Sequence, residues 1–249
     1  MRKRILITGA SSGLGAEMAR QYAAMGRDLA LCARRLDRLE QLRAELLDAN
    51  PSVEIAVHKL DVDDHDAVFT VFREAARALG GLDRVIVNAG LGKGAPVGTG
   101  RFAANRETVM TNLVSALAQC EAAMEIFRAS GAGHLVVISS MSAMRGLPRA
   151  LTAYAASKAG LATLAEGIRG EMLGSGIAVT TIYPGYIRSE MNERVASKTP
   201  LMSGTAPGVR AIVRAVEREV AEAEVPPWPW KPLGLVMRHA PLRVIRRFG

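Results

Sequence analysis

Short aliphatic runs alternate with longer segments in which apolar residues recur at helical spacing, and this alternation covers most of the chain. Runs rich in valine, isoleucine and leucine predict strands at residues 4–8, 28–33, 53–59, 84–88, 134–139 and 178–183. Strands that alternate with helices are typical of βαβ units and of a parallel sheet. The pattern therefore predicts an α/β fold, a doubly wound parallel sheet with helices on both faces.

The same alternation predicts the domain organisation. No repeat, low-complexity block or linker interrupts it before the proline-rich stretch near residue 226, and a length of 249 residues suits a single domain. We expect a main domain over residues 1–224, with a substrate lid at about residues 188–208, and a C-terminal extension over residues 225–249 that packs on the same domain. Ligands of such sheets bind where the strands end, so the loops after the first, fourth, fifth and sixth strands should meet there.

Composition narrows the class of protein. With 49% hydrophobic and 22% charged residues, the chain has the composition of an ordinary globular domain. Its two cysteines, Cys32 and Cys120, both lie in apolar stretches and form neither a disulfide framework nor a cluster of metal ligands. No apolar run is long enough for a signal peptide or a membrane span. We expect a cytoplasmic protein without a metal ion.

The net charge of +8 is concentrated at the C-terminus, because residues 225–249 hold five lysines and arginines and no acidic residue. Such a segment attracts anionic surfaces. A short basic amphipathic helix is predicted from Leu242 onward, with Leu242, Ile245 and Phe248 on one side and Arg243, Arg246 and Arg247 on the other. Three uses remain open: packing on the core, lining a substrate entrance, and peripheral membrane contact through residues 228–249. We expect no nucleic-acid partner.

A glycine-rich turn follows the first predicted strand. It reads Thr8-Gly9-Ala10-Ser11-Ser12-Gly13-Leu14-Gly15 and opens a helix. Glycines permit a tight turn and a close approach of the backbone, and the N–H groups at a helix N-terminus bind a pyrophosphate. The spacing departs from the common Gly-x-Gly-x-x-Gly fingerprint, but its place between strand and helix favours dinucleotide binding.

The end of the second predicted strand bears on the choice of cofactor. An NAD-binding unit needs a carboxylate there for the ribose hydroxyls, whereas this strand ends in Arg34 and Arg35. Two guanidinium groups suit a 2′-phosphate. We therefore predict NADP(H); arginines that only face solvent, with Asp37 serving NAD(H), are the alternative. Asp61-Val62 and Asn88-Ala89-Gly90 follow the third and fourth strands, where adenine and its ribose would lie.

Candidate catalytic residues lie at and after the end of the fifth predicted strand, and one more lies before it. Tyr154 and Lys158 are four residues apart on a predicted helix, so they share a helical face and the ammonium can lower the pKa of the phenol. That makes Tyr154 a candidate general acid. Three serines, Ser139, Ser140 and Ser142, compete to hold a substrate oxygen, and Asn112 stands mid-helix, where asparagine is disfavoured.

In combination these motifs resemble the short-chain dehydrogenase/reductase family, in its subfamily of chains near 250 residues. The resemblance spans residues 4 to about 191 and includes Pro184-Gly185. It implies a Rossmann-type fold, hydride transfer with a nicotinamide cofactor, a homodimer or homotetramer built on the helices that carry Asn112 and Tyr154, and a catalytic tetrad of Asn112, Ser140, Tyr154 and Lys158.

By this resemblance Tyr154 protonates the substrate oxygen, Ser140 orients it, and Lys158 holds the nicotinamide ribose and, through a water near Asn112, resupplies the proton. Ser140 lies fourteen residues before Tyr154 instead of the usual thirteen; the extra residue falls in the 148–152 loop. The expected cofactor-binding residues are Gly9, Ser11, Ser12, Gly13, Leu14, Gly15, Arg34, Arg35, Asp61, Val62, Asn88, Ala89, Gly90, Tyr154, Lys158, Pro184, Gly185, Ile187 and Ser189.

The substrate is expected to be a small hydrophobic carbonyl compound or alcohol, such as a lipid-like ketone, an acyl compound or a steroid. The expectation rests on apolar residues around the predicted lid and the loop after the fifth strand: Met144, Leu147, Leu151, Tyr186, Met191, Leu201 and Met202. A binding protein that senses NADP(H) without turnover and a membrane-surface protein are the alternatives from other classes.

Overall fold

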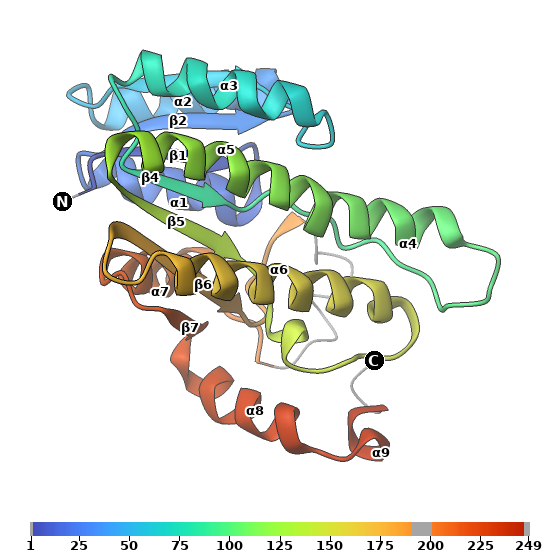
Figure 1. Cartoon of the computed structure of the whole chain (residues 1–249). Coiled ribbons are helices and arrows are strands. Elements are labelled where there is room, and N and C mark those ends of the chain that lie inside the picture. Colours follow the sequence, from blue (N-terminus) through green and yellow to red (C-terminus); the bar gives the residue numbers. More distant parts are fainter. Residues whose placement is uncertain (1, 191–200, 247–249) are drawn as a thin grey trace.

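The computed structural model describes residues 2–190 and 201–246. Its described strands form one parallel sheet in the order β3-β2-β1-β4-β5-β6-β7 (Figure 1). The six predicted strands are all present, and β1 and β2 have the predicted bounds. The strands are β1 Arg4–Thr8, β2 Asp28–Ala33, β3 Ile55–Lys59, β4 Arg84–Val87, β5 Ala132–Ile138, β6 Gly176–Pro184 and β7 Glu222–Val225.

Helices cover both faces of this sheet, as predicted. Helices α1 Gly13–Ala24, α2 Leu36–Ala49 and α7 Thr205–Glu217 pack on one face, and α3 His65–Ala78, α5 Ser115–Ser130 and α6 Thr152–Glu171 pack on the other. Helix α4, Phe102–Val109, continues through a π-helical turn at Met110–Val114 into α5. Two short 3-10 turns, Met141–Met144 and Arg149–Leu151, precede α6.

Two hydrophobic cores result from the alternation of side chains along each strand. In β1, Ile5 and Ile7 face the α1, α2 and α7 side, whereas Leu6 faces the α3, α5 and α6 side. All three are fully buried. Strands buried on both faces read as continuous apolar runs, which is why their positions can be predicted so closely from the sequence.

Strand β7 was not predicted. Its sequence, Glu222-Ala223-Glu224-Val225, carries two carboxylates, and only Val225 is fully buried. It pairs with β6 alone and forms the edge of the sheet, where charged side chains can stay in solvent. An edge strand of this kind lacks the apolar run on which the prediction depends.

The C-terminal segment beyond β7 forms α8, Pro227–His239, and the four-residue α9, Leu242–Ile245 (Figure 1, red). Trp230 and Ile245 are buried against the main domain, among Met141, Tyr183, Leu147 and Ala155. Of the apolar residues predicted to share one side of this helix, Leu242 is 65% exposed and Ile245 is 2% exposed, because Ile245 packs on Leu147 and Ala155. Arg247 and Phe248 lie outside the described residues.

Two features of the described residues bear on function. None of their helices is long and apolar enough to cross a membrane. No group of three or more histidine, cysteine, aspartate or glutamate side chains in this part of the chain is placed to hold a metal ion.

Candidate active site

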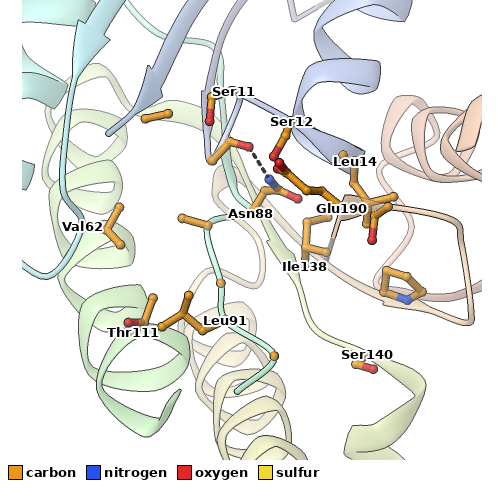
Figure 2. Close-up of a pocket in the computed structure, with 18 of the residues that line it drawn as sticks. Ser11, Ser12, Leu14, Val62, Asn88, Leu91, Thr111, Ile138, Ser140 and Glu190 are labelled. Carbon is orange, nitrogen blue, oxygen red and sulfur yellow. Dashed lines mark hydrogen bonds between the residues drawn. The ribbon is translucent and has the colours of Figure 1, made fainter. Parts of the chain in front are cut away.

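A cleft of about 460 Å³ opens at the carboxyl ends of the strands, where the loops after β1, β2, β3, β4, β5 and β6 meet (Figure 2). The convergence agrees with the prediction. Of the expected site residues, the cleft is lined by Gly9, Ser11, Ser12, Gly13, Leu14, Arg34, Arg35, Asp61, Val62, Asn88, Ala89, Gly90, Ser140, Tyr154, Lys158, Pro184, Gly185, Ile187 and Ser189. Gly15 and Asn112 do not line it.

The glycine-rich turn forms one wall of the cleft. Gly9 and Gly13 have φ values of +65° and +56°, in the left-handed region that other residues rarely adopt. An added Cβ at Gly9 would also lie 2.9 Å from the Cα of Ala89. The turn delivers the chain to the N-terminus of α1, where Gly13 and Leu14 line the cleft and the first N–H groups have no partner within the helix. The residues therefore fit a cradle for an anionic group such as a pyrophosphate.

Gly15 has a packing role that differs from the expected cofactor contact. An added Cβ there would lie 2.3 Å from the carbonyl oxygen of Gly9 and 2.8 Å from the amide nitrogen of Asn88. Only glycine lets α1 approach its own entry turn this closely. Gly15 shapes the cradle from behind.

Asn88 and Thr8 fix the spacing of β1 and β4 at the cleft. The Asn88 amide donates to the carbonyl oxygen of Thr8 at 2.9 Å, and the Thr8 hydroxyl accepts from the backbone N–H groups of Asn88 and Ala89 at 3.0 and 3.1 Å. Asn88 thus joins two strands at the wall of the cleft, and Figure 2 shows its amide directed at the glycine turn. Asp61 and Val62 lie across from this wall, after β3.

The two arginines after β2 differ in their contacts. Arg34 is exposed and lines the cleft. Arg35 donates to the hydroxyls of Ser11 at 3.2 Å and Ser12 at 2.8 Å, so its guanidinium lies over the glycine-rich turn. Both cations therefore lie at the end of the cleft where the glycine-rich turn forms the wall.

Tyr154 and Ser140 lie together at the other end of the cleft. Burial raises the pKa of the Tyr154 phenol above its usual value, and a hydrogen bond with Ser140 offsets part of that rise. The Ser139 hydroxyl donates to the backbone carbonyl of Lys158 at 2.8 Å and is engaged in the fold. Of these two serines, Ser140 is therefore the one whose hydroxyl is placed beside the phenol.

The expected influence of Lys158 on Tyr154 is wrong for this structure. Lys158 is buried, and its ammonium donates to the carbonyl oxygen of Ile138 at 2.8 Å. Burial lowers the pKa of Lys158 to about 8, and the groups that shift the pKa of Tyr154 are Ser140 and Tyr186. Spacing of four places both residues on one face of α6, but their side chains reach different partners.

Asn112 lies fully buried within the π-helical turn between α4 and α5. Its side chain exchanges two hydrogen bonds with the backbone of Leu91, accepting at 2.7 Å and donating at 2.9 Å. An added Cβ at Gly90 would lie 3.0 Å from the Asn112 oxygen and 3.3 Å from the Lys158 nitrogen. Asn112 thus holds the loop after β4 against Lys158, and π-helical turns of this kind are frequent at functional sites.

The turn after β6 is supported by the C-terminal segment. An added Cβ at Gly185 would lie 2.0 Å from the Trp230 ring, and Trp230 packs edge-on against Tyr186 with centroids 5.6 Å apart. The expected substrate residues Met144, Leu147 and Leu151 also pack against this segment. Leu201 is 57% exposed, and Met191 lies outside the described residues.

Sequence reasoning missed several cleft residues: Asp63, Leu91, Thr111, Ile138 and Glu190. Asp63 accepts hydrogen bonds from Thr111 at 2.9 Å and Ser115 at 2.7 Å, which ties the loop after β3 to the π-helical turn. Glu190 pairs with Arg35 and Arg38. None of these residues belongs to a motif, and each becomes visible only once distant loops are brought together.

The parallel sheet, the glycine turn and the Tyr154 cleft define a dinucleotide-binding α/β oxidoreductase. The sequence profile of the short chain dehydrogenase family matches residues 3–200. An uncharacterized oxidoreductase of Mycobacterium tuberculosis strain H37Rv is 56% identical over 248 residues, covering 100% of this chain and 98% of the relative. The chain therefore belongs to the short-chain dehydrogenase/reductase family, which uses nicotinamide cofactors.

Solved structures agree with this assignment. The crystal structure of levodione reductase has a TM-score of 0.80 and 27% identity, covering 89% of this chain and 94% of that one. An alcohol dehydrogenase from the archaeon Thermococcus sibiricus, complexed with 5-hydroxy-NADP, has a TM-score of 0.77 and 25% identity, covering 89% of this chain and 95% of that one. The same single α/β domain is thus found in all three.

Proposed function

We propose that this protein is an NADP(H)-dependent oxidoreductase that interconverts a small hydrophobic carbonyl compound and its alcohol. One observation carries the proposal: a single cleft has Tyr154, Ser140 and Lys158 at one end and two arginines, Arg34 and Arg35, at the other. The first group suits proton transfer to a substrate oxygen, and the arginines suit a 2′-phosphate. The complex of the archaeal relative with an NADP analogue supports the same cofactor.

The reaction assigns a separate task to each side chain. The nicotinamide cofactor supplies the hydride when bound. Tyr154 donates the proton to the substrate oxygen; its raised pKa keeps the phenol protonated at neutral pH, as a proton donor requires. Ser140 donates a hydrogen bond that orients that oxygen. Lys158, with a pKa of about 8, is mostly cationic at pH 7 and binds the ribose hydroxyls.

Proton supply is the proposed task of Asn112. Its amide fixes the backbone of Leu91, and that loop lies beside the Lys158 ammonium. A water held near this loop would carry a proton to Lys158 and on to Tyr154. We propose that Ile187 and Ser189 bind the carboxamide of the nicotinamide.

Binding measurements test the cofactor assignment. We would titrate the wild type, Arg34→Ala and Arg35→Ala with NADPH and NADH by fluorescence, with Arg43→Ala on α2 as the matched control. Arg43 pairs with Glu40 at 3.4 Å on the same helix. We expect NADPH to bind preferentially, and each cleft variant to lose about 10- to 100-fold in NADPH affinity, since a hydrogen bond to a charged group contributes about 1.5–3 kcal/mol. Equal binding, or preference for NADH, would contradict the proposal.

The proposed substrate is hydrophobic because the loop after β5 presents apolar side chains next to Ser140. Leu147 and Met144 belong to clusters completed by the C-terminal segment, which we propose is part of the catalytic domain and walls the substrate entrance. The name of levodione reductase, a relative in structure, is consistent with a ketone substrate. A protein that only senses NADP(H) would bind it without turnover of any such ketone.

We also propose that the C-terminal segment contacts an anionic membrane surface. The outward side of α8 and α9 exposes Trp228 by 79%, Leu235 by 63% and Leu242 by 65%. Cations stand among them, and no acidic residue occurs from residue 225 to 249. Exposed aromatic and aliphatic side chains within a basic surface are typical of peripheral membrane contact.

Vesicle binding tests this contact. Wild-type protein should sediment with vesicles that contain phosphatidylserine and remain free of vesicles of phosphatidylcholine alone. The double variant Trp228→Ser/Leu235→Ser should lose sedimentation while reductase activity is kept. Sedimentation that is absent, or equal for both vesicles, would contradict the proposal, and self-association lost in the double variant would assign this surface to a second copy instead.

We propose a homodimer or homotetramer built on the helices that carry Asn112 and Tyr154. Met110, Val114 and Leu117 are each 38–39% exposed and lie at helical spacing along one side of the π-helical turn and α5. Light scattering tests this oligomer: the variant Leu117→Glu is expected to be monomeric.

We further propose a cytoplasmic location, because the thiols of Cys32 and Cys120 are free and buried.

A further inference from the structure

Glu190 occupies an anion-binding position at the cradle. Its carboxylate accepts two hydrogen bonds from the forked end of Arg35, at 3.2 and 3.0 Å, and one from Arg38 at 3.1 Å. Arg35, Ser12 and Arg38, in that order of effect, lower the pKa of Glu190 to about 2. Figure 2 shows the Glu190 side chain against Ser12, at the entrance of the glycine turn. The carboxylate is thus ionised and held by three elements of the cradle.

These contacts join loops that are distant in the sequence. Ser12 is the N-cap of α1, Arg35 is the N-cap of α2, and Glu190 follows β6, one residue after Ser189. Two guanidinium groups, a hydroxyl and a helix N-terminus together form a site that suits a phosphate as well as a carboxylate. The carboxylate of Glu190 stands in for the oxygens of such a group.

The ion pairs of Glu190 with Arg35 and Arg38 are exposed enough for another anion to replace the carboxylate. The side chains of Arg35, Arg38 and Glu190 are 39%, 44% and 47% exposed. Ion pairs in such positions contribute little to stability, so an incoming dianion can displace the carboxylate from both arginines. A 2′-phosphate carries more charge than a carboxylate and offers three oxygens.

We propose that Glu190 is a specificity-determining residue that competes with the 2′-phosphate of NADP(H) for Arg35 and Arg38. This inference rests on the proposed NADP(H) function. Glu190 thereby lowers the affinity for NADPH selectively, because NADH has no group that needs these arginines.

The variant Glu190→Gln tests this competition, since it keeps the shape of the side chain and removes its charge. Glu40→Gln is the matched control, because Glu40 is an exposed carboxylate on α2 that pairs with Arg43. We would titrate both variants and the wild type with NADPH, NADH and adenosine 2′,5′-bisphosphate by calorimetry. Glu190→Gln should bind NADPH and the bisphosphate about 3- to 10-fold more tightly, the gain from removing two exposed ion pairs, with NADH changed by less than about twofold.

The outcomes separate the two proposals. A wild type that prefers NADPH, with Glu190→Gln no tighter, would overturn the role of Glu190 and leave the cofactor assignment intact. An equal gain in affinity for NADH, or the same gain in NADPH affinity in Glu40→Gln, would also overturn it. The gain would then come from the change in the net charge of the protein and not from competition at Arg35 and Arg38. A wild type without preference for NADPH would remove the proposed function and this inference together.

Discussion

Both ends of the parallel sheet bury a cation, and the two cations have different surroundings. At the amino ends of the strands, Arg84 is 1% exposed; it donates to His134 at 2.9 Å, to Glu217 and to the carbonyl oxygen of Val216 at 3.4 Å. At the carboxyl ends, Lys158 makes one hydrogen bond within the described residues, to Ile138. Its other two donors remain for a ligand.

This difference separates structure from chemistry. A buried charge with a full set of partners stabilises a fold but cannot change partners without a large cost. A buried charge with few partners, at the wall of a cleft, has a shifted pKa and can bind or transfer a proton. Burial of an ionisable group alone therefore does not locate an active site; a buried group whose open donors lie at the wall of a cleft does.

The largest expected effect concerns Tyr154→Phe, which removes the proposed proton donor. Turnover of a hydrophobic ketone should fall by about 10²- to 10⁴-fold, the usual contribution of general acid catalysis, with the melting temperature unchanged. Tyr22→Phe is the matched control, because Tyr22 is fully buried beside Arg84 at the other end of the sheet. Equal loss in both variants would mean that neither phenol has a chemical role.

Arg84→Met should lower the stability of the fold, whereas Tyr154→Phe should lower turnover. Removing one partner of a buried ion pair leaves Glu217 and His134 without their cation, and we expect the free energy of unfolding to fall by about 3–5 kcal/mol. Denaturant unfolding measures this, with Arg73→Met as the control, since Arg73 forms an exposed pair with Glu125 at 4.0 Å. A loss below about 1 kcal/mol, the range of exposed pairs, would show that the amino-end network does not stabilise the fold.

The pH dependence of stability below pH 6.5 should come mainly from the amino end. Burial, and after it the charge of Arg84, lower the pKa of His134 from 6.5 to about 3. The unfolded state therefore binds a proton that the folded state rejects between these values. Stability should fall as pH decreases from 6.5 toward 3, by up to about 1.4 kcal/mol per pH unit from this residue.

Urea unfolding between pH 7 and pH 4 measures this slope. His134→Gln, which keeps a hydrogen-bond donor and an acceptor, should have a shallower slope by close to one proton. An unchanged slope in that variant would place the acid sensitivity at other groups.

The smallest effect compares two adjacent serines. Ser139→Ala removes the hydrogen bond to Lys158 and should lower the free energy of unfolding by about 1 kcal/mol. Ser140→Ala should lower the free energy of unfolding by a comparable amount, because its hydroxyl accepts a hydrogen bond from the backbone N–H of Ser142 at 3.1 Å, and it should in addition lower turnover. Unfolding and steady-state kinetics of both variants decide this; turnover lost mainly in Ser139→Ala would reverse the assignment.

Much of the fold and of the cleft could be predicted from the sequence because the signals are local. The buried strands are apolar runs, Tyr154 and Lys158 are four residues apart, and the glycine turn follows β1 directly. Strand β7 could not be predicted, because an edge strand carries Glu222 and Glu224 without strain.

The rest depended on tertiary contacts. Nothing local distinguishes Glu190, or marks Arg84 as a buried side chain, until β5, α7 and the turn after β6 are in place. Gly15 was predicted as a cofactor contact since it belongs to the motif, yet its position behind the turn follows from the packing of α1 against Gly9. The pKa of Tyr154 was misjudged because shared helical facing does not fix where a lysine side chain ends.

The central claim is that the carboxyl end of the sheet transfers hydride from NADPH to a hydrophobic carbonyl carbon, with Tyr154 supplying the proton. The most direct test is to incubate the protein with NADPH deuterated at C4 of the nicotinamide, separately on each face, and hydrophobic ketones, and to analyse the alcohol by mass spectrometry. We predict one deuterium on the carbinol carbon from one face only, with formation of the labelled alcohol strongly reduced in Tyr154→Phe. Alcohol without deuterium from either face, or equal formation by Tyr154→Phe, would contradict the account.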